Sequence, residues 1–233
     1  METSVGAHGY IYLRMSERDI VPRGRHAPPL EVRQDRQLQR LSDAAAAVFA
    51  RVGYADSTAE AIAREAGMSK ATFYEHFSNK EDCIIGLFDR AMDRLIGAME
   101  ATRDHHADLT PAQRYAISIR GLLAVIDAFR NHAQTLLIEI IGAGPRAMAR
   151  RDAFLDAIAD YIAERNAEDV AAGRSRPLES RDDAYAVVGA ALELASRQIR
   201  TGVPEDIMDL APSIERLFLG VLAATPDSQP AAT

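Results

Sequence analysis

Apolar residues return every three or four positions along most of this chain, and that spacing constrains the fold more than any other feature. Leu38, Leu41, Ala45 and Val48 form one such stripe, which ends at Gly53. Residues at this spacing share one face of a helix, so each stripe predicts an amphipathic helix. Few segments show the period-two alternation of a strand. The sequence therefore predicts an all-α fold.

Helix start signals divide the first hundred residues into four helices. Ser57 followed by Glu60 predicts a capping box at the start of a short second helix. Ser69 is placed as the N-cap of a short third helix. A longer fourth helix is expected to start near Asn79 and to end near Arg103. The second and third helices are joined by a tight turn that contains glycine, which is the helix-turn-helix arrangement.

The remaining segments also read as helices. Thr110 and Pro111 open one that ends near Arg130, with proline at the first helical position. Ser180, with Asp183 three residues on, opens another that ends at Gly202. The further helices are expected over 133–141, 146–172 and 204–223, the last opened by Pro204 and Glu205.

These elements predict two structured units between flexible ends. The expected divisions are a disordered extension over 1–30, a helix-turn-helix domain over 31–78 with its motif at 58–77, a larger C-terminal helical domain over 79–224, and a disordered tail over 225–233.

The composition of the chain indicates the cellular compartment in which it works. The single cysteine, Cys83, excludes an intramolecular disulfide and fits a reducing cytoplasm. We interpret it as a packing residue. No apolar run reaches the roughly 18 residues of a membrane helix, and the charged N-terminus is unlike a signal peptide. We expect a cytoplasmic, nucleoid-associated protein with no membrane partner.

The net charge of −7 hides an uneven distribution. Residues 23–80 hold nine basic and seven acidic side chains, whereas residues 81–233 hold 16 basic and 24 acidic ones. Both lysines of the chain, Lys70 and Lys80, lie in the stretch "MSKATFYEHFSNKEDC" at 68–83. A slightly basic N-terminal part is therefore joined to an acidic body.

On a helix, this stretch separates into two faces. Phe73 and Phe77 lie one turn apart and are expected to pack inward. The opposite arc carries small or hydrogen-bonding side chains, as a helix in the major groove needs. Ser69 and Lys70 lie at the helix N-terminus, where free N–H groups attract phosphate. A plain solvated surface helix would also place polar residues outward. The choice between such a helix and a DNA-binding one therefore depends on the wider pattern of two short helices joined by a glycine turn.

That wider pattern resembles the TetR family of bacterial transcriptional regulators. The residues that carry the resemblance are "TAEAIAREAG" followed by "MSKATFYEHFSNKEDC", and it covers about 36–96. The resemblance implies phosphate contacts for Thr58 and Lys80 and base-edge positions for Lys70, Ala71 and Thr72. It also implies that Tyr74 and His76 clamp the DNA backbone. Glu75 departs from the polar or basic residues common at its position.

Arg23 and Arg25, upstream of the motif, fit either a basic arm that enters the minor groove or a solvated tail.

The resemblance further implies a homodimer that binds a palindromic operator and a small-molecule effector that releases it. No cofactor is expected. Apolar side chains of the last two helices are candidates for the dimer interface or for internal core: Val188, Ala191, Leu192, Ile214, Leu217, Phe218 and Val221. Candidates for contact with a hydrophobic or aromatic ligand, or for plain core, are Leu87, Met92, Leu95, Tyr115, Ile119, Leu122, Phe129, Phe154, Ile158 and Tyr161.

Two other classes of protein compete with a regulator. His105 and His106, with Asp104 and Asp108, could indicate a metal enzyme, but adjacent histidines on a helix point about 100° apart and chelate poorly. Motifs for a serine hydrolase, a P-loop or a dinucleotide site are absent from the sequence. We therefore expect no enzyme activity. The alternative to a regulator is a helical enzyme or adaptor without DNA binding.

Overall fold

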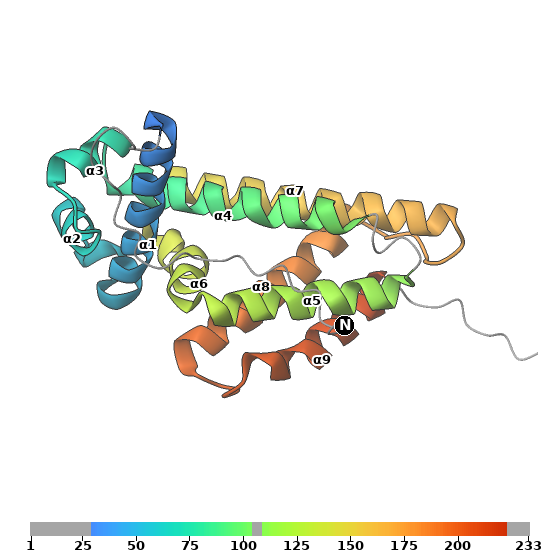
Figure 1. Ribbon diagram of the computed structural model, residues 1–233. Coiled ribbons are helices and arrows are strands. Elements are labelled where there is room, and N and C mark those ends of the chain that lie inside the picture. Colours follow the sequence, from blue (N-terminus) through green and yellow to red (C-terminus); the bar gives the residue numbers. More distant parts are fainter. Residues whose placement is uncertain (1–28, 104–108, 223–233) are drawn as a thin grey trace, which may run out of the picture.

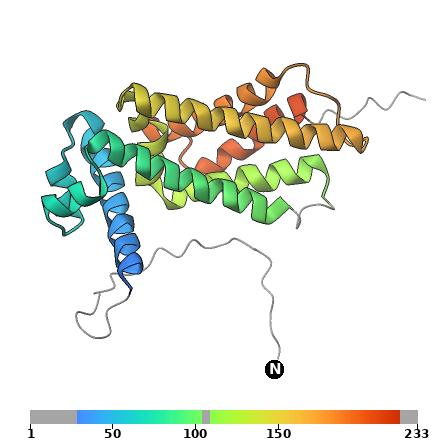
Figure 2. The same ribbon diagram turned by 90° about the horizontal axis from the view of Figure 1, so that it is seen from above.

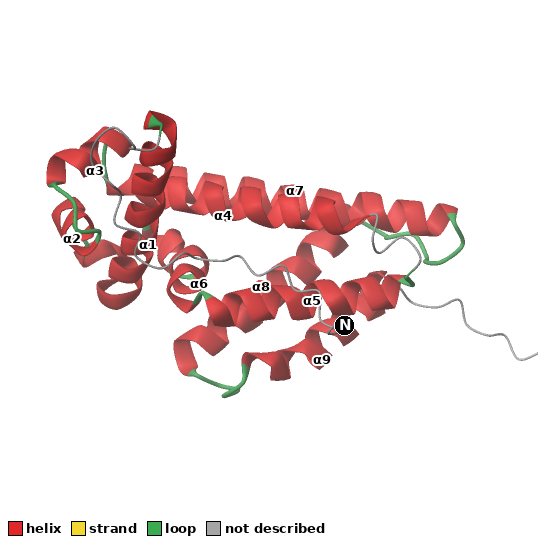
Figure 3. Ribbon diagram, viewed as in Figure 1, coloured by secondary structure: helices red, strands yellow, loops and turns green. Residues whose placement is uncertain are grey.

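The computed structural model describes residues 29–103 and 109–222, and every regular element in that part of the chain is a helix (Figure 3). This confirms the all-α prediction. None of the described helices is both long and apolar enough to cross a membrane. The elements are α1 (Leu30–Asp56), α2 (Ala59–Glu65), α3 (Lys70–His76), α4 (Lys80–Arg103), α5 (Pro111–Ala128), α6 (Arg130–Leu137), the 3-10 turn η2 (Glu139–Gly142), α7 (Pro145–Ala171), α8 (Arg181–Thr201), the 3-10 turn η3 (Ile207–Leu210) and α9 (Ala211–Leu222).

Most helix ends follow the local signals in the sequence. The Ser69 side chain accepts the Thr72 N–H at the start of α3. Thr110 and Ser180 form capping boxes at the starts of α5 and α8. Gly202 ends α8 in the left-handed conformation at φ 69°, where a residue without Cβ is favoured.

Two predicted starts are wrong. The N-cap of α2 is Thr58, whose side chain accepts the Ala61 N–H. Ser57 is buried and donates instead to the Tyr54 carbonyl at 2.7 Å, so no Ser57 capping box forms. The last helix does not start at Pro204, because the Pro204 carbonyl accepts from Gln198 and a 3-10 turn precedes α9.

The end of α1 is broken at Gly53, where the sequence predicts the helix to stop. Gly53 has φ 79° and ψ 160°, and a helical turn resumes beyond it. The Tyr54 N–H, freed by the break, donates to the Glu139 carboxylate of η2 at 2.7 Å. Two further bonds from α6 reach α1, Gln134 to the Ala50 carbonyl and Thr135 to the Ala46 carbonyl. These contacts fasten α6 and η2 to the end of α1.

The first three helices pack together at one end of the molecule (Figure 1). Phe49, Ile62 and Phe73 are fully buried at their centre. The same hydrophobic cluster continues past the predicted boundary at 78/79. It includes Ile84 of α4 and Ile140 of η2, so the three-helix unit shares its core with the body.

The body consists of two groups of helices. α4 and α7 run side by side away from the three-helix unit, and α5, α8 and α9 form the other group (Figures 1 and 2). A second hydrophobic cluster, built mainly from α5, α7, α8 and α9, holds that group together. Phe154 of α7 packs against both clusters.

Candidate nucleic-acid interface

The orientation of α3 is fixed by its two phenylalanines. Phe73 and Phe77 are buried, as predicted, with ring centroids 5.5 Å apart. The helix packs chiefly on α2 at the far end of the molecule from α5 and α9 (Figure 1). Its opposite side therefore faces solvent, away from the body.

The solvent-facing side of α3 carries most of the residues predicted to contact DNA. Lys70, Ala71 and Tyr74 are exposed, and Tyr74 exposes 49% of its surface. Ala71 contributes only a methyl group, which permits close approach of another surface. Thr72 is half-buried, and its hydroxyl lies 2.9 Å from that of exposed Ser69. Five of the residues predicted to contact DNA therefore lie together here, namely Ser69, Lys70, Ala71, Thr72 and Tyr74.

Two residues predicted to contact phosphate, Thr58 and Lys80, lie near this surface. They differ in the bonds that their side chains already make within the protein. Thr58 is exposed at the start of α2, and its hydroxyl oxygen accepts the Ala61 N–H at 3.1 Å. The Lys80 ammonium instead donates to the carbonyls of Tyr54, Ala55 and Ser57 at 2.7, 2.9 and 3.2 Å. An ammonium has three N–H donors, so this one is saturated.

The Lys80 ammonium also lies 4.4 Å from the centroid of the Tyr54 ring. A cation at the last carbonyls of a helix stabilises that helix end. Lys80 therefore joins the start of α4 to the end of α1. A phosphate contact would require it to leave one of its three carbonyls.

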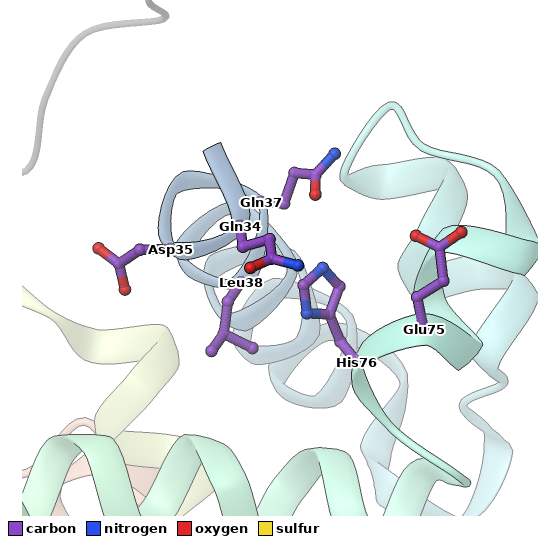
Figure 4. Close-up of a pocket in the computed structure, with 6 residues that line it drawn as sticks. All are labelled: Gln34, Asp35, Gln37, Leu38, Glu75 and His76. Carbon is purple, nitrogen blue, oxygen red and sulfur yellow. The ribbon is translucent and has the colours of Figure 1, made fainter. Parts of the chain in front are cut away.

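His76 faces α1, whereas Glu75 faces away (Figure 4). The two side chains lie at the edge of a hollow of about 550 Å³ whose other lining residues are Gln34, Asp35, Gln37 and Leu38 of α1. The Nε2 atom of His76 is buried and has no hydrogen-bond partner among the described residues. Since it is turned toward Gln34, His76 is not presented to solvent like Tyr74.

Burial behind this surface shifts two pKa values. Burial raises the pKa of the Cys83 thiol to about 12, in agreement with a packing role. Burial, and then the charge of Glu81, raises the pKa of Tyr54. Neither group ionises near neutral pH, so the positive charge near α3 is set by lysine and arginine side chains.

Sequence reasoning missed the residues that support the motif from outside it. Arg40 donates to the Ala66 carbonyl at 2.7 Å and thereby closes the end of α2. Glu139 accepts the Tyr54 N–H across 85 residues of sequence. The sequence does contain a signal for the role of Glu139, because it is a single acid between apolar residues in "LLIEIIG". A charge in such a place needs a buried partner.

The ten predicted ligand residues do not form one group. Leu87 is buried in the first hydrophobic cluster, against which Met92 also packs. Ile119 is buried in the second. Phe154 touches both. Half-buried side chains packed on the second cluster are Tyr115, Leu122, Ile158 and Tyr161, while Leu95 and Phe129 are half-buried elsewhere.

The seven predicted dimer residues divide by exposure. Four are buried within the protomer's own core: Val188, Ala191, Ile214 and Phe218. Leu192, Leu217 and Val221 are half-buried and pack against the second hydrophobic cluster. Only these three retain surface that a second copy could cover.

Some predicted positions lie outside the described residues, namely Arg23, Arg25, Asp104, His105, His106 and Asp108. Both predicted disordered ends, 1–30 and 225–233, also fall almost entirely there. Within 29–103 and 109–222, no group of three or more acidic, histidine or cysteine side chains is placed to hold a metal ion.

Residues 41–87 match the model of the tetR family of bacterial regulatory proteins, and this segment contains α2, α3 and their turn. Over these residues the chain carries the helix-turn-helix segment that is characteristic of the TetR family. The match covers the helix-turn-helix and the start of α4, the same segment that carries the exposed face of α3.

Two Bacillus subtilis proteins that resemble this chain bear the names of regulators. The fatty acid metabolism regulator protein of Bacillus subtilis is 33% identical over 101 residues, or 43% of this chain and 51% of that protein. The matched segment thus spans about half the length of this relative. The HTH-type transcriptional regulator YhgD of the same organism is 24% identical over 79% of this chain and 95% of its own length.

Solved structures share the fold over most of the chain. FadR from Bacillus subtilis, in complex with stearoyl-CoA, has a TM-score of 0.70 at 24% identity and covers 78% of this chain and 98% of its own. NalD, the secondary repressor of a multidrug efflux pump in Pseudomonas aeruginosa, has a TM-score of 0.67 at 20% identity, with 82% and 98% covered.

Proposed function

We propose that this chain is a homodimeric, sequence-specific DNA-binding regulator of transcription from the TetR family. In this proposal it is a cytoplasmic repressor that leaves a palindromic operator when a small apolar ligand binds. The observation that carries the proposal is the open face of α3. Buried Phe73 and Phe77 hold Ala71 and Tyr74 outward, on a helix face that the described part of the chain leaves exposed.

The DNA-binding role is tested by selection of genomic fragments with the full chain, followed by gel shifts at several salt concentrations. We expect a palindromic site whose affinity falls steeply with salt, because phosphate contacts release counterions. Ala71→Glu places a carboxylate at the centre of the exposed face without touching the core, and it should abolish binding while the helical circular dichroism spectrum stays unchanged. No binding to any fragment at low salt would favour an adaptor or an enzyme.

The homodimer would be formed by the outer sides of α8 and α9. Leu192, Leu217 and Val221 support this, since they are apolar and only half-covered in the protomer. A dimer would place two copies of α3 about 34–36 Å apart, the spacing of successive major grooves. Leu217→Arg should give a monomer in analytical ultracentrifugation. Val125→Arg, at an exposed apolar side chain of α5, is the matched control and should stay dimeric.

The ligand would be a molecule with a long apolar chain, such as a fatty acyl-CoA. The Bacillus subtilis FadR structure contains stearoyl-CoA, and the present chain carries half-buried Tyr115, Leu122 and Ile158 packed against its second hydrophobic cluster. Binding would favour a conformer in which the two α3 helices no longer match the operator. Acyl-CoA of 8 to about 18 carbons should release the operator in gel shifts. Release by free CoA alone would refute the apolar-chain requirement.

A further inference from the structure

We propose that Glu75 determines sequence specificity by accepting a hydrogen bond from the exocyclic amino group of a cytosine in the major groove. This inference rests on the proposed DNA-binding function and assigns one base preference to one side chain. It accounts for the acidic residue that departs from the family pattern.

The geometry of α3 places Glu75 beside the point of closest approach. At 100° per residue, Ala71 lies between Tyr74 and Glu75 on the exposed arc. Both neighbours are exposed, whereas Phe73 and Phe77 are buried on the other side. Glu75 lies at the edge of the hollow that it lines with His76, and its side chain extends away from α1, whereas His76 faces α1 (Figure 4). A helix docked on its Ala71 side therefore brings the Glu75 carboxylate to the base edges.

The Glu75 carboxylate has no compensating partner in the part of the chain that the structure describes. Among the described residues, no hydrogen bond or ion pair reaches Glu75. The two lysines are placed elsewhere. Lys70 lies 4.0 Å from Glu60, and the Lys80 ammonium is held by three carbonyls. In this proposal the Glu75 carboxylate enters the major groove with its oxygens free to accept hydrogen bonds.

The chemistry of the groove selects what this acceptor can bind. Guanine presents N7 and O6 acceptors and thymine presents O4, all of which repel a carboxylate. Cytosine presents the N4 amino donor. Adenine also has an amino donor, but its adjacent N7 acceptor would face the second carboxylate oxygen. Cytosine is therefore the base that satisfies Glu75 without repulsion.

The test is selection of binding sites from a randomised DNA pool with the full-length chain, its Glu75→Gln variant and its Glu75→Ala variant. We expect the wild-type chain to require cytosine at one position of each half-site, with a preference of about tenfold over other bases. Glu75→Gln should change that preference to adenine, because an amide pairs with both N6 and N7. Glu75→Ala should lose the preference there and keep it at all other positions.

The matched control is Glu60→Gln, which removes the same charge from an exposed side chain of α2. Both glutamine variants should raise the non-specific affinity for DNA, because each removes a negative charge, but only Glu75→Gln should alter a base preference. An unchanged preference in both Glu75 variants overturns this inference and leaves the DNA-binding function standing. Failure of the wild-type chain to select any sequence overturns the proposed function itself.

Discussion

Asp169 offers a sharp test of what holds the body together. Its side chain, near the end of α7, is only 2% exposed and accepts from two arginines. Arg114, 12% exposed, reaches it from the first turns of α5. Arg174, 45% exposed, donates to the other carboxylate oxygen through Nε and Nη2 at 3.1 and 2.8 Å. The carboxylate therefore ties α5 and α7 to the loop that follows α7.

Asp169→Ala should lower the free energy of unfolding by about 3–5 kcal/mol, because it leaves the Arg114 guanidinium buried without a counter-charge. For a chain of this size each kcal/mol corresponds to about 2–4 °C in melting temperature. We therefore expect the midpoint to fall by roughly 6–20 °C. Urea unfolding followed by circular dichroism measures the free energy directly.

Two further variants make the result specific to the buried charge. Asp127→Ala removes an exposed acid that pairs with Arg130 within three residues, and such a pair contributes little. Asp169→Ala combined with Arg114→Met removes both buried charges and should recover much of the lost stability. If Asp169→Ala costs less than about 1 kcal/mol, or the double variant is no more stable than the single one, the reasoning is refuted.

Three other predictions follow from single side chains. Lys80→Met should weaken binding to all operator variants alike but leave the salt slope of binding as in the wild type, because its ammonium holds carbonyls; a flatter slope in gel shifts would restore the phosphate contact. Cys83, whose pKa burial raises to about 12, should react with Ellman's reagent only after unfolding in urea, and rapid labelling of the native chain would contradict its burial. Tyr115 has its pKa raised to about 12, first by burial and then by the charge of Asp169. Below pH about 10 both states keep the phenol proton. Between about 10 and 12 only the unfolded state loses it, so the free energy of unfolding should fall with pH more steeply than in Tyr115→Phe.

The sequence predicted what depends on near neighbours. Ser69, Thr110 and Ser180 bond to N–H groups two or three residues away, and a short motif contains all the information needed to place such caps. The inward direction of Phe73 and Phe77 follows from helical spacing alone. These local rules placed α3 and identified its exposed side.

The features that the sequence did not reveal depend on distant partners. Lys80 donates to carbonyls of residues 23 to 26 positions away, so its contact between α1 and α4 could not be read from the motif, and its phosphate contact stays a prediction. Ser57 was misplaced as a cap because the Tyr54 carbonyl competes for its hydroxyl. The sequence also did not show that Ile214 and Phe218 are buried in the protomer's own core. A periodic apolar stripe does not distinguish such a core from a surface shared with a second copy.

The hydrophobic cluster that joins the three-helix unit to the body limits how this protein could be recombined. A hybrid regulator made by exchanging residues 31–78 would inherit Phe49, Phe73 and Phe77 without the side chains that Ile84 and Ile140 contribute to the same core. It would also lose the hydrogen bond from the N–H of residue 54 if the recipient body lacks a carboxylate at position 139. A functional graft would have to carry the first turns of α4 together with α6 and η2. For engineering and for evolution alike, the exchangeable unit is discontinuous in the sequence.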